Sequence, residues 1–142
     1  MKAMQVYDQT TELKLRSKDA VIHFEEGLIG FSEYKDFVLM ENDSFAPFRL
    51  LQSLESPQVG FLVLEPTALV NNYYDLVPAR EWESLGIGGK TKPLAFVIVV
   101  VGANPESSTG NLQAPLLINY DNMLGKQIIL TDSGFSVRHP LI

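Results

Sequence analysis

Short apolar runs separated by turn-forming residues fill most of the chain. The runs are rich in β-branched and aromatic residues, and some alternate apolar with polar positions, the period of two that is typical of a half-buried strand. Gly, Pro, Asn, Asp and Ser stand between the runs, and these residue types favour turns. We therefore predict strands at residues 12–16, 21–24, 37–40, 48–51, 60–64, 94–101, 116–118 and 127–130.

One segment carries a helical signal instead. Pro78 suits the start of a helix, Trp82 and Leu85 lie three residues apart on one face, and Gly86 suits the end. We predict one short helix there. Because few helical segments separate the strands, the fold class is mainly β, with antiparallel strands that close as a barrel or pack as a sandwich.

Composition limits the chemistry that the chain can perform. Its 142 residues fit one domain, and 46% of them are apolar. The absence of cysteine excludes a disulfide framework, a thiolate zinc site and a cysteine nucleophile. His23 and His139 are the only imidazoles, and neither has a neighbouring serine motif or a partner at metal-ligand spacing. We therefore expect no metal, no cofactor and no enzymatic activity.

Charge is unevenly distributed along the chain. Residues 19–83 hold 12 acidic and 3 basic side chains, a balance of −9, which leaves +3 for the rest of the net charge of −6. Lys14, Arg16 and Lys18 form the only basic grouping, and a solvated strand face explains it. Since phosphate contacts need clustered bases, we expect no direct binding of nucleic acid, and an acidic surface favours a basic partner.

The N-terminal sequence lacks the apolar core of a signal peptide. The longest apolar run, at 94–101, is also far shorter than the roughly 20 residues of a membrane helix. We expect a soluble, cytoplasmic protein with no membrane partner.

Clustered aromatic residues are the best candidates for a binding surface. In an extended segment, adjacent Tyr73 and Tyr74 would point to opposite faces, so one of them would meet solvent or a partner. Exposed aromatics beside acidic residues suit a basic, partly apolar partner, whereas core packing at a bend is the alternative. The candidate partner-binding residues from this argument are Phe45, Phe48, Asn72, Tyr73, Tyr74 and Asp75.

Several stretches agree in order and spacing with one known family. The most distinctive are Gly-Leu-Ile-Gly-Phe at 27–31 and Asn-Leu-Gln-Ala-Pro at 111–115. Over residues 21–142 the chain resembles the FliW family of flagellar assembly factors. The full set of matching stretches is 24–31, 47–53, 60–61 with Pro66 and Tyr73, 109–115, 118–119 and 125–127.

The resemblance implies a single-domain (residues 1–142), antiparallel β-barrel-like fold without catalytic activity. It implies that the chain binds the RNA-binding translational regulator CsrA and also flagellin, which compete for it. Accumulating flagellin would then free CsrA to repress translation of the flagellin message. Asn111 and Gln113 in the second motif join the candidate partner-binding residues, with a purely architectural role as the alternative. We expect a monomer.

A second function class stays open. Small β-barrels often bind an oligonucleotide or an oligosaccharide directly. The lack of a basic groove beside the aromatic residues counts against this alternative.

Overall fold

The computed structural model describes residues 19–88, 91–131 and 133–141. The strand predicted at 12–16 therefore lies outside the described residues. In chain order the described elements are β1 (Ala20–Phe24), β2 (Asp36–Glu41), η2 (Asp43–Phe45), β3 (Arg49–Ser53), β4 (Gly60–Leu64), η3 (Pro66–Ala68), η4 (Tyr73–Leu76), α1 (Ala79–Glu83), β5 (Leu94–Val100), η5 (Pro105–Ser107), β6 (Thr109–Gly110), β7 (Leu116–Asn119), β8 (Leu124–Gln127) and β9 (His139–Pro140).

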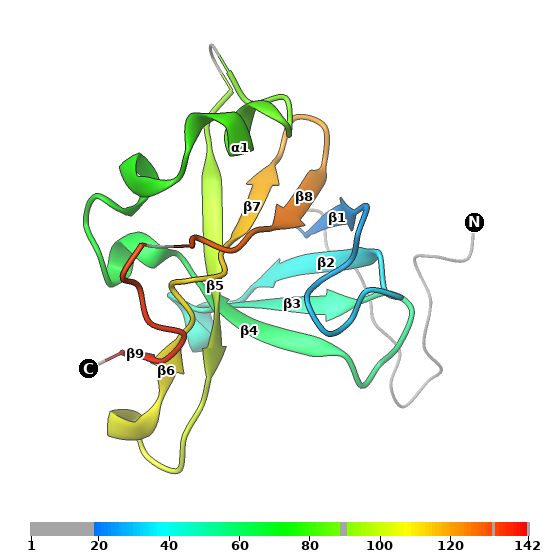
Figure 1. Ribbon diagram of the computed structural model, residues 1–142. Coiled ribbons are helices and arrows are strands. Elements are labelled where there is room, and N and C mark those ends of the chain that lie inside the picture. The colour runs from blue at the N-terminus through cyan, green and yellow to red at the C-terminus, as the bar shows by residue number, and fades with distance from the viewer. Residues whose placement is uncertain (1–18, 89–90, 132, 142) are drawn as a thin grey trace.

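Seven of these strands close into a barrel (Figure 1). The order runs β4-β3-β2-β1-β8-β7-β5, and the pairing of β5 with β4 completes the circle. The pairing of β1 with β8 is parallel and covers two residue pairs, His23 with Leu124 and Phe24 with Gly125. The mainly β, barrel-like fold is thus confirmed, and the expected antiparallel sheet is corrected at this one seam.

Alternate strand residues fill the barrel interior. In β1, Ala20, Ile22 and Phe24 are buried, whereas Val21 and His23 between them are half-buried, as the period of two predicts. The ring of Phe24 packs edge-on against Phe37, with ring centroids 5.7 Å apart. The other buried members of this core are Leu28, Leu39, Leu51, Val63, Phe96, Leu116 and Ile118.

A second core lies outside the barrel, against β5 and β7. Ala95, Val97 and Leu117 face it from the strands, and Trp82 and Leu130 cover it from α1 and the C-terminal segment. Figure 1 shows the helical turns and this segment on one side of β5, with the barrel strands on the other. Because β5 is covered on both faces, its sequence is continuously apolar rather than alternating.

The predicted helix is confirmed as α1. Trp82 and Leu85 are buried, and Gly86 ends the turn with a φ of +83°. The strand predicted at 127–130 is wrong, because β8 covers Leu124–Gln127 and the chain then leaves the sheet so that Leu130 enters the second core.

The connection between β1 and β2 depends on two glycines. Gly27 has a φ of +68° and Gly30 a φ of +86°, in the region that L-residues avoid. At Gly27 a β-carbon would also lie 2.6 Å from the backbone Cα of Ser32. The two glycines of the motif at 27–31 are therefore required by the backbone of this loop.

Candidate partner-binding site

An acidic pocket opens at one end of the barrel, where β2 ends, β3 begins and β4 ends. Its volume is about 410 Å³. Glu41, Asp43 and Glu65 contribute carboxylates, Arg49 contributes the only cation, and Phe48 contributes an aromatic wall. We refer to this site as the acidic pocket.

The turn that carries Asp43 is held by its own side chains. The Asn42 side-chain oxygen accepts hydrogen bonds from the Ser44 backbone N–H at 2.8 Å and from the Ser44 hydroxyl at 2.7 Å. The Phe48 N–H donates to the Phe45 carbonyl at 2.9 Å. Asn42 therefore caps the short helix η2, and the loop keeps a defined shape beside the pocket.

The guanidinium of Arg49 contacts three neighbouring side chains at this end of the barrel. Its guanidinium lies 5.3 Å from the centroid of the Phe96 ring, and a guanidinium nitrogen lies 3.8 Å from a Glu41 carboxylate oxygen. It also donates to the Tyr120 hydroxyl at 3.4 Å. Among the described residues, Asp43 and Glu65 pair with no Lys or Arg. The pocket therefore keeps an unbalanced negative charge.

A second pocket of about 310 Å³ adjoins the first, since Arg49 and Glu65 line both. Tyr74 and Tyr120 supply its aromatic walls. The Tyr74 hydroxyl lies 3.3 Å from a Glu65 carboxylate oxygen and accepts a hydrogen bond from the Ala95 N–H at 3.0 Å. Burial raises the pKa of Tyr74 to about 12, so this hydroxyl stays neutral and can donate near neutral pH.

Tyr73 is a core residue, which corrects the expectation that it faces a partner. Its side chain is fully buried, its hydroxyl donates to the Leu112 carbonyl, and its ring packs at 5.1 Å from that of Phe135. The two tyrosines lie in the 3-10 helix η4, not in an extended segment. Adjacent side chains of a 3-10 helix are about 120° apart, so Tyr74 also leans against the protein and is half-buried.

The remaining candidates fall in separate places. Phe48 lines the acidic pocket and Phe45 beside it is half-buried. Asn72, just before η4, and Asp75, within it, are both exposed. Asn111 and Gln113 lie in the loop before β7.

The Asn111 side chain stabilises the backbone of that loop. Its side-chain oxygen accepts from the Gln113 N–H at 3.1 Å and the Ala114 N–H at 3.2 Å, and the Gln113 carbonyl accepts from Leu130 at 2.7 Å. These bonds support the architectural alternative for the motif at 111–115. A partner contact by the half-buried Gln113 side chain stays a prediction.

Sequence reasoning missed Arg49, Glu65 and Tyr120, which shape the two pockets. Arg49 stands near the start of a predicted strand, Glu65 and Tyr120 stand just beyond the ends of two others, and 71 residues separate Arg49 from Tyr120. Their common signal is a charged or aromatic residue at a strand end, but only the strand order shows that these ends meet.

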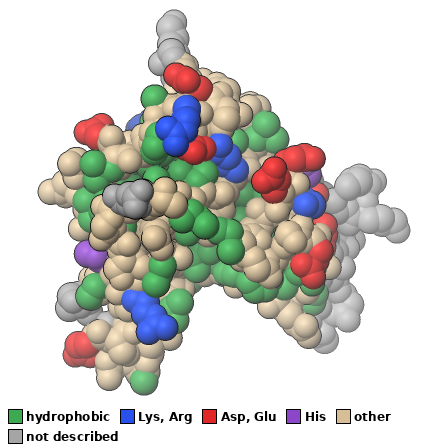
Figure 2. Space-filling view, viewed as in Figure 1, with side chains coloured by type: hydrophobic (Ala, Val, Ile, Leu, Met, Phe, Trp, Pro, Cys, Tyr) green, Lys and Arg blue, Asp and Glu red, His purple; other side chains and the backbone are tan. Residues whose placement is uncertain are grey.

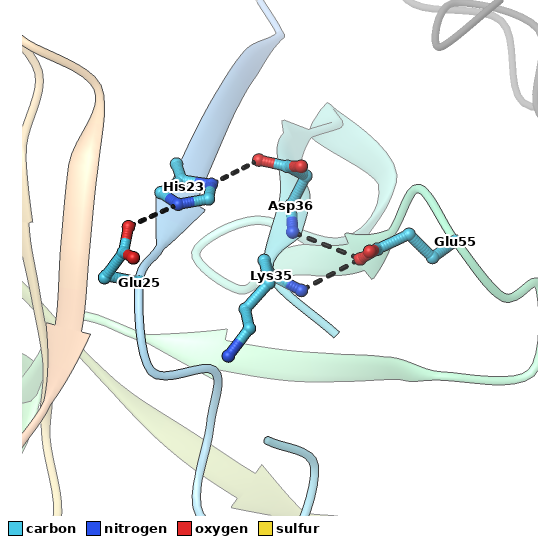
Figure 3. A network of polar contacts seen from close by, with 5 residues as sticks. All are labelled: His23, Glu25, Lys35, Asp36 and Glu55. Atoms are coloured by element: carbon cyan, nitrogen blue, oxygen red, sulfur yellow. Dashed lines mark hydrogen bonds and ion pairs between the residues drawn. The ribbon is translucent and has the colours of Figure 1, made fainter. Parts of the chain in front are cut away.

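A second group of carboxylates lies around His23, at the start of β2 rather than at its end (Figure 3). The imidazole bonds to Asp36 at 2.8 Å through Nδ1 and to Glu25 at 2.9 Å through Nε2. These hydrogen bonds, first Asp36 and then Glu25, raise the pKa of His23 above 6.5. In Figure 2 carboxylates gather on the right of the molecule, over the connection between β1 and β2.

Other kinds of site find no support in the described part of the chain. No group of three or more His, Asp or Glu residues there is placed to hold a metal ion. Nor does any helix in those ranges combine the length and apolar character needed to cross a membrane.

Comparison with known proteins identifies the relatives of this barrel. The family model described as "FliW protein" matches residues 7–141. The chain belongs to the FliW family. The flagellar assembly factor FliW of Leptospira interrogans is 38% identical over 127 residues, which cover 89% of this chain and 85% of that one. The FliW of Geobacillus thermodenitrificans is 36% identical over 130 residues, covering 92% and 89%.

The fold agrees with that of a solved FliW protein. A crystal structure of the flagellar assembly factor FliW superimposes with a TM-score of 0.78 at 36% identity, covering 92% of this chain and 91% of that chain. The chain therefore has the FliW-type barrel and belongs to a family whose named members are flagellar assembly factors. The two distinctive motifs now have structural explanations in the turns at Gly27 and Asn111.

Proposed function

We propose that the chain binds the translational regulator CsrA and flagellin in the cytoplasm, as a monomer, and thereby relieves repression of flagellin translation by CsrA. It performs no catalysis, and flagellin and CsrA compete for it. The proposal rests on the family and on the acidic character of residues 19–83. The single observation that carries it is the acidic pocket, whose only arginine is already engaged by Phe96 and Glu41.

The pocket favours a basic protein for an electrostatic reason. Asp43 and Glu65 present carboxylates that no cation of the described residues neutralises, and Phe48 offers an apolar surface beside them. Complementary charge accelerates association and orients the partners, while an aromatic wall provides buried contact area. The same charge repels a phosphate backbone, which disfavours direct binding of RNA.

Isothermal titration calorimetry with purified CsrA tests the first interaction. We expect binding that weakens as salt rises, because the screening length falls from about 10 Å at 0.1 M to about 3 Å at 1 M ionic strength. Asp43→Lys should weaken binding and reduce its dependence on salt. Glu83→Lys makes the same charge change on the exposed surface of α1 and serves as the matched control. Absence of binding at both low and high salt would refute this interaction.

Flagellin gives the second test. Addition of flagellin to a preformed complex should release CsrA in proportion to the flagellin added, as followed by size-exclusion chromatography. A stable complex of all three proteins would show that the two partners do not compete. A gel shift of single-stranded RNA by this protein alone would instead support a barrel that binds nucleic acid directly.

A further inference from the structure

An apolar groove lies beside the acidic pocket on the outer surface of the barrel. Its volume is about 560 Å³, and it runs between β4 and the hairpin that joins β5 to β6. Its walls are mainly apolar and include Leu62, Val99, Val101 and Leu141. Figure 2 shows a notch between the hairpin at the bottom and the body of the molecule, bordered by hydrophobic side chains.

The groove exposes a large apolar side chain to solvent. Val101, which lines it, is 66% exposed, and its neighbour Val100 is 63% exposed. Only Val101 belongs to the groove. A concave apolar surface of this kind, with an exposed valine at its wall, is typical of sites that bind another molecule.

Phe48 joins the groove to the acidic pocket. Its side chain lines both, so an apolar surface and a set of carboxylates lie on either side of one ring. The loop before Phe48 is fixed by the Asn42 cap and by the bond from the Phe48 N–H to the Phe45 carbonyl. The wall between the two halves therefore has a defined position before any ligand arrives.

We propose that the groove and the acidic pocket form one bipartite docking site for a short protein segment that carries a Lys or Arg next to large apolar side chains. The apolar side chains bury against Leu62 and Val101, and the basic group meets Asp43 and Glu65 across Phe48. The inference rests on the proposed function, which it deepens by stating what chemistry a partner must present. A second copy of this chain fits less well, because its net charge of −6 opposes its own acidic pocket.

Selection from a random peptide library displayed on phage tests this inference without assuming which partner is bound. The wild-type chain is the bait, and the Val101→Glu variant is used to remove peptides that do not need the groove. Enriched peptides should contain Lys or Arg beside Leu, Ile, Phe or Met. As synthetic peptides they should bind Val101→Glu at least about tenfold more weakly than the wild type, the loss expected for a central contact.

Val100→Glu is the matched control, because it places the same charge one residue earlier at nearly equal exposure but outside the groove. Peptide affinity should be unchanged in this variant, and circular dichroism should show that both variants fold. Asp43→Lys should weaken the peptides through their basic residue, and replacing that residue by Gln should abolish the sensitivity to Asp43→Lys.

Several results would overturn the inference. They are failure to enrich any peptide, enrichment of acidic or wholly polar peptides, and equal loss of affinity in Val100→Glu and Val101→Glu. A dimer in sedimentation that Val101→Glu converts to a monomer would assign the groove to a second copy and would also overturn it. Failure of CsrA and flagellin to bind would refute the proposed function alone, because the peptide selection uses neither protein.

Discussion

The backbone amide of Ile29 donates a hydrogen bond of 2.8 Å to the side-chain oxygen of Gln127, a residue 98 positions later in the chain. The amide nitrogen of the same glutamine donates to the Ala114 carbonyl at 3.0 Å. Gln127 thus ties the loop at 27–31 to the loop at 111–115. The two distinctive family motifs thus meet at one side chain, which itself lies in the matching stretch at 125–127.

Replacing Gln127 by Ala should destabilise the protein. Both hydrogen bonds are lost, and each contributes on the order of 0.5–1.5 kcal/mol, so the free energy of unfolding should fall by about 1–3 kcal/mol. Urea denaturation measures the change. Gln58→Ala, at an exposed position, is the control and should stay within about 0.5 kcal/mol of the wild type. Equal effects of the two substitutions would contradict the bridging role of Gln127.

Tyr73→Phe should lower stability although it preserves the ring. The substitution leaves the buried Leu112 carbonyl without its donor, which costs about 1–3 kcal/mol. Tyr73→Ala also removes the ring from the second core and should cost about 3–5 kcal/mol. Thermal unfolding of both variants should show a larger loss of stability for Tyr73→Ala than for Tyr73→Phe. If Tyr73→Ala left the melting temperature unchanged, the residue would not belong to the core.

The fold was largely predictable because its strands carry local signals. The β-branched and aromatic composition of β1 and β5 is visible in the sequence, as is the amphipathic turn around Trp82. The strands β6 and β9 each contain two residues, too few to show any period, and neither was predicted.

Other features depend on contacts between distant segments. Ile128 and Leu130 have the composition of a strand, but Leu130 is buried in the second core and Ile128 packs against that core. Tyr73 and Tyr74 were expected on opposite faces, and the 3-10 geometry of η4 turns both towards the protein. The acidic pocket requires three strand ends to meet, which no local pattern encodes.

Protonation of His23 should stabilise the folded state. Its pKa is raised above 6.5 by its hydrogen bonds to Asp36 and Glu25, so the stabilisation is complete below about pH 6.5 and is lost as pH rises through the folded pKa. The melting temperature of the wild type should therefore fall relative to that of His23→Gln between pH 6 and pH 8.

An NMR titration of the His23 imidazole tests the cause of this shift. Asp36→Asn should lower the pKa of His23 more than Glu25→Gln does, because the bond to Asp36 makes the largest contribution. A wild-type pKa at or below that of the urea-unfolded chain would contradict the assignment.

Gly125→Ala should disrupt the seam between β1 and β8. A β-carbon at this position would lie 2.7 Å from the Phe24 ring, which is itself packed against Phe37. Overpacking of this kind costs about 1–3 kcal/mol. Gly88→Ala is a suitable control, since nothing lies within 4 Å of the added carbon. Chemical denaturation should separate the two variants, and equal midpoints would show that the Phe24 ring moves aside freely.

The parallel seam between β1 and β8 also sets the order of events during synthesis. The first described strand can find its second neighbour only when residues 124–125 have been made, so β1 leaves the ribosome long before the barrel can close. Until then β1 lacks β8 as a neighbour on one side, and that edge can pair with other chains. Closure between segments about a hundred residues apart raises the contact order and slows folding. The β1 edge of the nascent chain is therefore open to mispairing until nearly the whole length has been translated.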